Sequence, residues 1–167
     1  MILAFDTFYI EDKAKTVCFK FDALETKLQI YSEVIENKQD YISGEFYKKE
    51  LPCIVSLMAQ INLDDLEFII IDGYVYLDDK MKKGLGAHLF IMLERRFPII
   101  GVAKTNFATI EKLKSIILRG ESKKPLYISS IGISLDVAAA FIKQMKGNFR
   151  IPDTLKKLDQ YTKQNCR

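Results

Sequence analysis

One stretch decides the fold of this chain of 167 residues: Glu67-Phe68-Ile69-Ile70-Ile71-Asp72-Gly73. Its four consecutive apolar residues favour a buried strand, of the kind found in the centre of a parallel sheet. Asp72 and Gly73 follow where the apolar run stops, which places a carboxylate at the end of the strand. The rest of the fold is worked out from this strand in both directions.

The residues before this stretch indicate three strands and a helix. Residues 2–9, 16–21 and 28–36 have the composition and alternation of strands, and a charged turn at residues 11–15 separates the first two. We expect these three strands to be antiparallel. Between residues 45 and 61 the apolar side chains recur at helical spacing, with Pro52 in the first turns or at a bend. Ser43 is the expected N-cap.

The residues after the stretch alternate between helix and strand. We expect helices over residues 84–93, 134–145 and 151–163, strands over 98–102, 115–119 and 126–130, and a short helical piece at 110–114. Ser134 is expected to cap its helix and Gly147 to end it. Strands followed by such an alternation predict an α/β fold, a mixed sheet with helices on both faces. The length favours one domain over residues 1–167.

Composition narrows the functional classes. Hydrophobic residues make up 49% and charged residues 28% of the chain, which is ordinary for a globular protein. No apolar run approaches the roughly 20 residues of a membrane span, and the first residues lack the pattern of a signal peptide. Cys18, Cys53 and Cys166 form neither a metal pattern nor a disulfide framework. We therefore expect no membrane association and a cytoplasmic location.

Histidine content and charge bear on ligands. His88 is the single histidine, so a zinc site of nitrogen and sulfur ligands is not expected, and a bound metal would be a hard cation held by oxygen. The net charge of +3 and the pI near 8.6 are only mildly basic. Lysines and arginines nevertheless gather between residues 80 and 124. That gathering is compatible with a solvated surface or with a nucleic-acid partner.

Three acids are candidates for a metal site. Asp6 lies near the end of the first strand, Asp72 ends the buried strand, and Glu50 lies in the helix expected after Tyr41. Ligand sites in α/β sheets gather at the carboxyl ends of strands. Converging carboxylates repel each other unless a cation neutralises them, and such a site suits Mg²⁺ and phosphodiester hydrolysis. Taken alone, the spacing is also that of an ordinary Asp-Gly turn.

Four segments, in order along the chain, carry a family resemblance. They are Tyr41-Ile42-Ser43-Gly44-Glu45-Phe46-Tyr47-Lys48-Lys49-Glu50-Leu51-Pro52; Ile69-Ile70-Ile71-Asp72-Gly73 followed by Gly84-Leu85-Gly86-Ala87-His88-Leu89; Ile100-Gly101-Val102-Ala103-Lys104; and Lys124-Pro125-Leu126-Tyr127-Ile128-Ser129 followed by Ser134-Leu135-Asp136. Together they resemble the endonuclease V family and its Tyr-Ile-Pro, Asp-Gly, Ile-Gly-Val-Ala-Lys and Ser-Leu-Asp segments.

The resemblance implies a ribonuclease H-like fold and a role for each matching residue. Asp6, Glu50 and Asp72 would ligate Mg²⁺, with Mn²⁺ as a substitute. Lys104 would lie near the scissile phosphate and act with the three acids in catalysis. Tyr41 would engage the strand near the lesion, and Gly73 would contact the nucleic acid. The implied activity is cleavage of phosphodiester bonds near deaminated bases, the inosine class, in DNA or RNA.

The chain departs from the family at specific places. The Gly-His-Arg or Gly-His-Lys that precedes Ser-Leu-Asp, with its catalytic histidine, is replaced by Ser130-Ile131-Gly132-Ile133. The basic His-Pro-Arg-Arg after Asp-Gly is replaced by Asp78-Asp79-Lys80-Met81. His88 matches a helix histidine and is expected to be structural.

These departures keep two alternatives open. One is a degenerate endonuclease V-like protein that binds nucleic acid with little or no cleavage. The other is a different ribonuclease H-like nuclease with a further ligand elsewhere. In each case the expected partner is nucleic acid, and a monomer is favoured.

Overall fold

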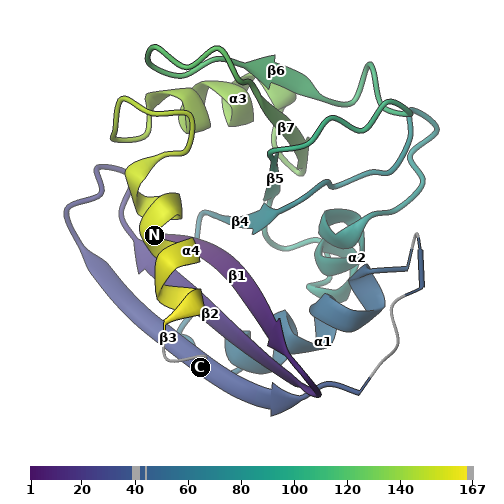
Figure 1. Ribbon diagram of the computed structural model, residues 1–167, viewed down its shortest axis with the longest axis vertical. Coiled ribbons are helices and arrows are strands. Elements are labelled where there is room, and N and C mark those ends of the chain that lie inside the picture. Colours follow the sequence, from purple (N-terminus) through teal and green to yellow (C-terminus); the bar gives the residue numbers. More distant parts are fainter. Residues whose placement is uncertain (39–41, 44, 165–167) are drawn as a thin grey trace.

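A mixed sheet with helices on its faces makes up the protein (Figure 1). The computed structural model describes residues 1–38, 42–43 and 45–164. Within these residues the sheet has seven strands: β1 (Ile2–Ile10), β2 (Lys13–Phe21), β3 (Leu28–Glu36), β4 (Phe68–Asp72), β5 (Ile99–Ala103), β6 (Ser115–Ile117) and β7 (Leu126–Ile131). Their order across the sheet is β3-β2-β1-β4-β5-β7-β6. The helices are α1 (Tyr47–Met58), α2 (Leu85–Met92), α3 (Leu135–Gln144) and α4 (Asp153–Lys163).

The three N-terminal strands form an antiparallel meander at one side of the sheet, as predicted. Ile10 pairs with Lys13, so the first turn contains only Glu11 and Asp12 and is shorter than the predicted residues 11–15. Glu11 has a φ of 50°. This left-handed conformation lets the chain reverse within two residues, and the residues expected in the turn extend the strands instead.

The buried strand predicted from the isoleucine run lies in the middle of the sheet. β4 pairs in parallel with β1 on one side and with β5 on the other. Ile69, Ile70 and Ile71 are each no more than 2% exposed. Burying an isoleucine side chain contributes about 1.5–3 kcal/mol, so this run anchors the fold. The sheet continues through the antiparallel strands β7 and β6.

Helices cover both faces of the sheet. Leu3 and Ile71 belong to a core that packs against α1 and α2, whereas Ala4 and Ile70 belong to a second core that packs against α3 and α4. Successive strand residues point to opposite faces, which explains the division. Figure 1 shows α4 lying across β1 and β2. The predicted arrangement, a mixed sheet with helices on both faces, is confirmed.

The predicted start of α1 was wrong. Ser43 is not its N-cap; the helix begins at Tyr47, with Phe46 at the cap position and no side-chain hydrogen bond there. Backbone turns take over the capping role, because Glu45 N–H donates to the Ile42 carbonyl at 3.0 Å and Lys48 N–H donates to the Glu45 carbonyl at 3.0 Å.

The predicted helical piece at residues 110–114 was also wrong; these residues form bends. The backbone N–H groups of Glu111, Lys112 and Leu113 donate to the carboxylate of Asp79 at 2.9–3.2 Å. These hydrogen bonds satisfy the backbone of the bend without any helical turn following it.

The predictions for the C-terminal helices hold with one change. Ser134 caps α3 by accepting a hydrogen bond from Val137 N–H at 3.2 Å, as expected. The helix ends at its C-cap Met145, and Gly147 lies two residues further on with a φ of 104°. Residues predicted as a helical tail form α4. Within the described residues, no helix has the length and apolar character of a membrane span.

Candidate active site

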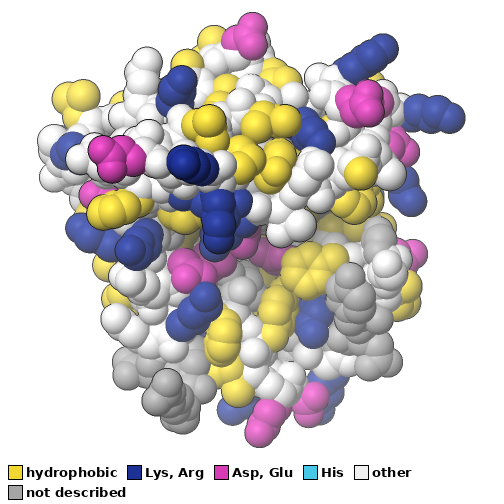
Figure 2. All heavy atoms as spheres, turned by 45° about the horizontal axis from the view of Figure 1, so that its top comes forward, with side chains coloured by type: hydrophobic (Ala, Val, Ile, Leu, Met, Phe, Trp, Pro, Cys, Tyr) yellow, Lys and Arg dark blue, Asp and Glu magenta, His cyan; other side chains and the backbone are white. Residues whose placement is uncertain are grey.

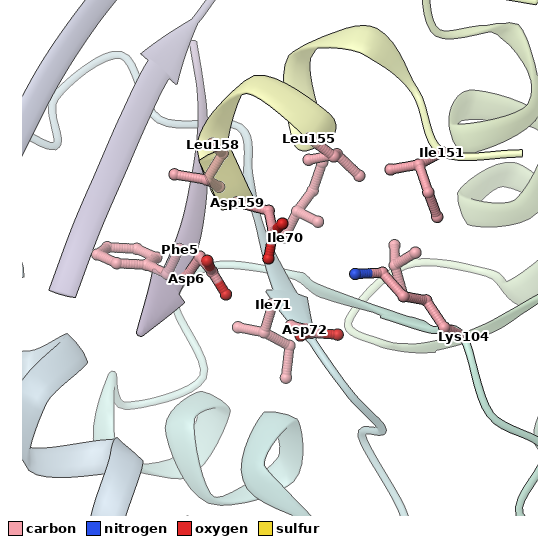
Figure 3. A pocket seen from close by; sticks show the side chains of 11 residues that line it. Phe5, Asp6, Ile70, Ile71, Asp72, Lys104, Ile151, Leu155, Leu158 and Asp159 are labelled. Carbon is pink, nitrogen blue, oxygen red and sulfur yellow. The ribbon is translucent and has the colours of Figure 1, made fainter. Parts of the chain in front are cut away.

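Asp6 and Asp72 lie side by side just beyond the last pair of the parallel ladder between β1 and β4. Asp72 is the last residue of β4, whereas Asp6 lies in the middle of β1 and not near its end as predicted, because β1 continues to Ile10 in its pairing with β2. The register of β1 and β4 pairs Phe5 with Ile71, and the next residue on each strand is one of these two acids. Both line a cavity of about 50 Å³ between the sheet and α4 (Figure 3). We call it the acid cavity; its charged lining residues are Asp6, Asp72, Asp159 and Lys104.

The environment opposes the ionisation of both aspartates. Burial raises the pKa of Asp6 to about 6, and the charges of Asp72 and Asp159 add to the rise. A hydrogen bond with Thr162 lowers the pKa and offsets part of it. Asp72 itself reaches solvent at the mouth of the cavity. The surrounding protein nevertheless raises the pKa of Asp72, although the charge of Lys104 opposes the rise. Acids held in this way gain stability from a bound cation.

Glu50 approaches the same edge from the opposite face of the sheet. It lies in the first turn of α1 and is 5% exposed. Burial raises the pKa of Glu50 to about 8, with the charges of Asp72 and Asp6 adding to the rise. The three acids predicted from the sequence therefore sense one another's charge, although they project from two faces of the sheet.

Asp159 is a fourth acid, which the sequence analysis missed. It lies on α4 and faces the cavity between Asp6 and the end of β5 (Figure 3). Its carboxylate forms a salt bridge of 2.8 Å with Lys163. A signal was present in the sequence, because Leu155 and Leu158 mark the buried side of a helix. Asp159 follows Leu155 by one helical turn and so lies on that side.

Lys104 enters the acid cavity from the side opposite β1. It directly follows β5, and its amine points toward Asp72 and Asp159 in Figure 3. Its backbone carbonyl accepts a hydrogen bond from Arg150. An ammonium group beside converging carboxylates is placed to contact an anion that approaches the cavity, such as a phosphate.

The donor set suits a hard divalent cation, because every acid here offers oxygen. Among residues 1–38, 42–43 and 45–164, however, no group of three or more His, Cys, Asp or Glu side chains is arranged to hold a metal ion. Asp6 and Asp72 face α4, whereas Glu50 comes from α1 on the other face. The oxygen donors therefore fit Mg²⁺ by chemical type.

A wider groove of about 610 Å³ also includes Asp72. Gly73 lines it with a φ of 115°, in the region that favours glycine. We call it the aromatic groove, because four aromatic side chains line it: Phe46, Tyr47, Tyr74 and Phe107. Flat rings in a groove beside a carboxylate can stack on a nucleobase. Tyr41, predicted to engage the strand, lies outside the described residues.

Two loops, residues 73–84 and 104–114, are joined beside this groove. The Tyr74 hydroxyl donates to the Thr105 carbonyl at 2.7 Å, and the Thr109 hydroxyl donates to the Leu77 carbonyl at 2.6 Å. The Asp79 carboxylate also accepts hydrogen bonds from the backbone N–H groups of residues 111–113. The acidic segment that replaces the family's basic residues thus ties the two loops together.

Neither His88 nor the segment that lacks the family's histidine lines the acid cavity. The ring of His88 stacks on Tyr47 with 3.7 Å between the ring centroids. In the segment Ser130–Ile133, which lacks the histidine, the Ser130 hydroxyl donates to the Ile133 carbonyl at 2.9 Å, and Gly132 has a φ of 77°. These residues form a tight turn after β7.

Charge is arranged around the cavity in a pattern that suits a polyanion. Figure 2 shows acidic side chains in a hollow at the centre of one face, with lysine and arginine side chains around it. A phosphate backbone is attracted by the surrounding cations. The acids at the centre repel it unless a metal ion lies between them.

Comparisons with known proteins agree with this geometry. The sequence matches endonuclease V over residues 1–160. No curated protein sequence matches the chain. Among solved structures, the endonuclease V of Ciona intestinalis, in complex with DNA containing an inosine followed by a ribo-adenosine, is 18% identical, with a TM-score of 0.82 over 96% of this chain and 83% of that one.

Two further structures share the fold. The endonuclease V of Streptomyces avermitilis is 22% identical, with a TM-score of 0.73 over 96% of this chain and 78% of that one. The Argonaute of Clostridium butyricum, bound to a guide DNA and a target DNA, is 14% identical, with a TM-score of 0.56 over 99% of this chain and 26% of that one. The fold is therefore ribonuclease H-like. Because the family match extends over nearly the whole sequence, the chain belongs to the endonuclease V family.

Proposed function

We propose that this protein is a divalent-metal-dependent endonuclease that cleaves phosphodiester bonds near deaminated bases, the inosine class, in DNA or RNA. The observation that carries the proposal is the gathering of Asp6, Asp72 and Asp159 beside Lys104, with Glu50 approaching from the other face. Neighbouring acids that oppose one another's ionisation, with Glu50 buried among them, are an unfavourable arrangement without a cation. The divalent cation of a nuclease site would neutralise these acids.

Asp6, Glu50 and Asp72 would hold Mg²⁺, or Mn²⁺ in its place. When bound, such an ion supplies Lewis-acid stabilisation of the charge that develops on phosphate oxygens. Lys104 would bind a non-bridging oxygen of the scissile phosphate and offset the same charge. Asp159, which faces the cavity and is paired with Lys163, is a further candidate ligand.

The aromatic groove supports nucleic acid as the partner. It includes Asp72 and Gly73, so a base held there would lie beside the acids. Stacking of a base on an aromatic side chain is worth about 1–3 kcal/mol. The Ciona intestinalis protein was solved with inosine-containing DNA, which favours the same class of base here. Tyr41 would engage the strand next to the lesion.

The test uses single-stranded and duplex oligonucleotides that contain one inosine. We expect nicking that requires Mg²⁺ or Mn²⁺ and is abolished by Asp72→Ala. Asp64→Ala, which removes an exposed acid outside the acid cavity, is the matched control and should cleave like the wild type. Metal-independent nicking, or nicking that survives Asp72→Ala, would contradict the proposal.

A second candidate is a protein that binds nucleic acid but cleaves it little or not at all. Two observations favour it: the tight turn where the family's histidine is absent, and the approach of Glu50 from the opposite face of the sheet to Asp6 and Asp72. Binding of the inosine oligonucleotides without cleavage at any concentration of Mg²⁺ or Mn²⁺ would select this candidate.

The remaining proposals concern the state of the protein in the cell. The Cys18 and Cys53 thiols are free and buried, which supports a reducing, cytoplasmic location. A single domain over residues 1–167 and a monomer in solution stay predictions.

A further inference from the structure

Two arginines hold the connection between α3 and α4, and they do so differently. The Arg119 guanidinium donates to carbonyls of the connection itself, to Met145 at 2.5 Å, Gly147 at 3.1 Å and Phe149 at 2.6 Å. Arg119 is 3% exposed, and its bonds shape the connection internally. Arg150 lies at the end of the same connection but donates to the sheet.

The Arg150 guanidinium bridges two neighbouring strands. Its Nε donates to the Pro125 carbonyl at 3.0 Å and its Nη2 to the same carbonyl at 2.8 Å, while Nη2 also donates to the Lys104 carbonyl. The ladder between β5 and β7 ends with the pair Ala103 and Tyr127. Arg150 thus joins the two strands just beyond their last backbone pair.

This position connects the two walls of the acid cavity. One wall is formed by Lys104 at the end of β5, and the other by Ile151 and Asp159 on the α4 side. Arg150 immediately precedes Ile151 in the chain and hydrogen-bonds the Lys104 carbonyl. The direction of the Lys104 side chain follows from its backbone, which the guanidinium restrains.

We propose that Arg150 is a positioning residue that sets the Lys104 ammonium against Asp159 and Asp72 across the cavity. Its effect on cleavage rests on the proposed nuclease function, whereas its effect on the Lys104 backbone does not. A planar guanidinium offers several donors in fixed directions and so can serve two carbonyls at once, which a lysine ammonium on a flexible stem does less well. Arg150→Lys keeps the charge and loses that geometry.

The experiment compares full-length wild type, Arg150→Ala and Arg150→Lys with Lys157→Ala, which removes an exposed α4 charge. With inosine oligonucleotides and Mg²⁺, we expect kcat to fall about 100-fold in Arg150→Ala, the loss that a misplacement of about 1 Å can cause. KM should change little, because Lys104 keeps its charge. Non-denaturing guanidinium chloride should restore part of the rate, and Lys157→Ala should behave as the wild type.

A second measurement keeps the inference independent of activity. Amide hydrogen exchange over residues 101–105 should accelerate in both Arg150 variants, slow again with added guanidinium, and stay unchanged in Lys157→Ala. If the wild type does not cleave, the proposed function fails while exchange still tests Arg150. The inference is overturned if exchange over these residues is unchanged in Arg150→Ala. It is equally overturned if cleavage declines only in proportion to the unfolded fraction.

Discussion

The acid cavity and the aromatic groove share Asp72, but different interactions hold them in shape. The acid cavity is built on regular elements: the parallel register of β1 and β4 and the packing of α4 against them place its side chains. The groove is bordered by two loops. Hydrogen bonds that the Tyr74 and Thr109 hydroxyls donate and the Asp79 carboxylate accepts join these loops together. In the proposed function, the chemistry would depend on these regular elements, whereas recognition would depend on loops that a few substitutions can alter.

One departure from the family follows this division, whereas the segment that replaces the family's histidine begins on β7. The four acids and Lys104 lie on strands, helices or their ends. The acidic segment Asp78-Asp79-Lys80-Met81, in contrast, lies in a loop. We infer that the cavity limits the rate of cleavage and the groove limits the choice of substrate, and each prediction below tests one side of that statement.

The largest effect is expected from Lys104→Met, which removes the ammonium of the acid cavity. The nicking rate should fall about 100- to 1000-fold, the usual loss when one group that stabilises transition-state charge is removed. Because Lys104 is exposed, thermal unfolding should be nearly unchanged. Binding of the inosine oligonucleotide should weaken far less than the rate. An equal loss of binding and rate would place Lys104 in recognition instead.

The next effect is on stability and pH. The pKa of Glu50 lies near 8 in the folded state, well above its ordinary value of 4.5. The folded protein therefore holds more protons than the unfolded chain between these values. The free energy of unfolding should fall as the pH rises through this window, by up to about 1.4 kcal/mol per pH unit. The pKa of Asp6, raised to about 6, likewise makes the free energy of unfolding fall as the pH rises toward that value.

Urea unfolding without divalent metal, from about pH 5 to about pH 8, measures this dependence. Glu50→Gln should flatten it, since glutamine does not titrate. Saturating Mg²⁺ should flatten it as well, because the cation stabilises the ionised acids. A wild-type stability that rises with pH over this range would show that Glu50 is not held in a protonated state.

A smaller effect is expected in the groove. Asp79→Ala removes the carboxylate that accepts the N–H groups of residues 111–113. Hydrogen exchange of these amides should accelerate, and cleavage of inosine substrates should fall about tenfold through looser positioning of the strand. The ratio of the cleavage rates for inosine and adenosine substrates should decrease by a larger factor than the maximal rate does. Asp64→Ala serves as the control, and an unchanged preference would separate Asp79 from recognition.

The smallest effect concerns Lys163, which pairs with Asp159 at 2.8 Å. In Lys163→Met the acid cavity loses a nearby positive charge, so its affinity for Mg²⁺ should increase a few-fold, as titration calorimetry can measure. Lys157→Met is the matched control on the same helix. An i,i+4 pair of this exposed kind contributes only about 0.3–0.5 kcal/mol to stability. A fall in Mg²⁺ affinity would mean that Lys163 orients Asp159 for the metal.

Much of the fold follows from local patterns in the sequence. The isoleucine run at residues 69–71 must be buried, and a buried strand between helices belongs in the middle of a sheet. Strand and helix periods are local properties, so every strand and the four helices were predictable within a few residues. The strand ends likewise predicted where Asp72 and Lys104 lie, whereas Asp6 lies in the middle of β1.

The two errors have different origins. Residues 110–114 resemble a helical piece, but the carboxylate of Asp79, more than thirty residues away, accepts the N–H groups of residues 111–113, and the sequence around them gives no sign of that partner. Ser43 is a good cap by type, but local backbone hydrogen bonds among Ile42, Glu45 and Lys48 take its place.

The sequence by itself determined the chemistry available to this protein: an α/β sheet, the candidate acids Asp6, Glu50 and Asp72 with Lys104, and membership of the endonuclease V family. Only the tertiary structure decided that α4 brings Asp159 to the same cavity, that Glu50 comes from the opposite face, and that Arg150 spans the two walls. The physical reason is that residue type and period are set locally, whereas burial and mutual charge depend on which elements pack together.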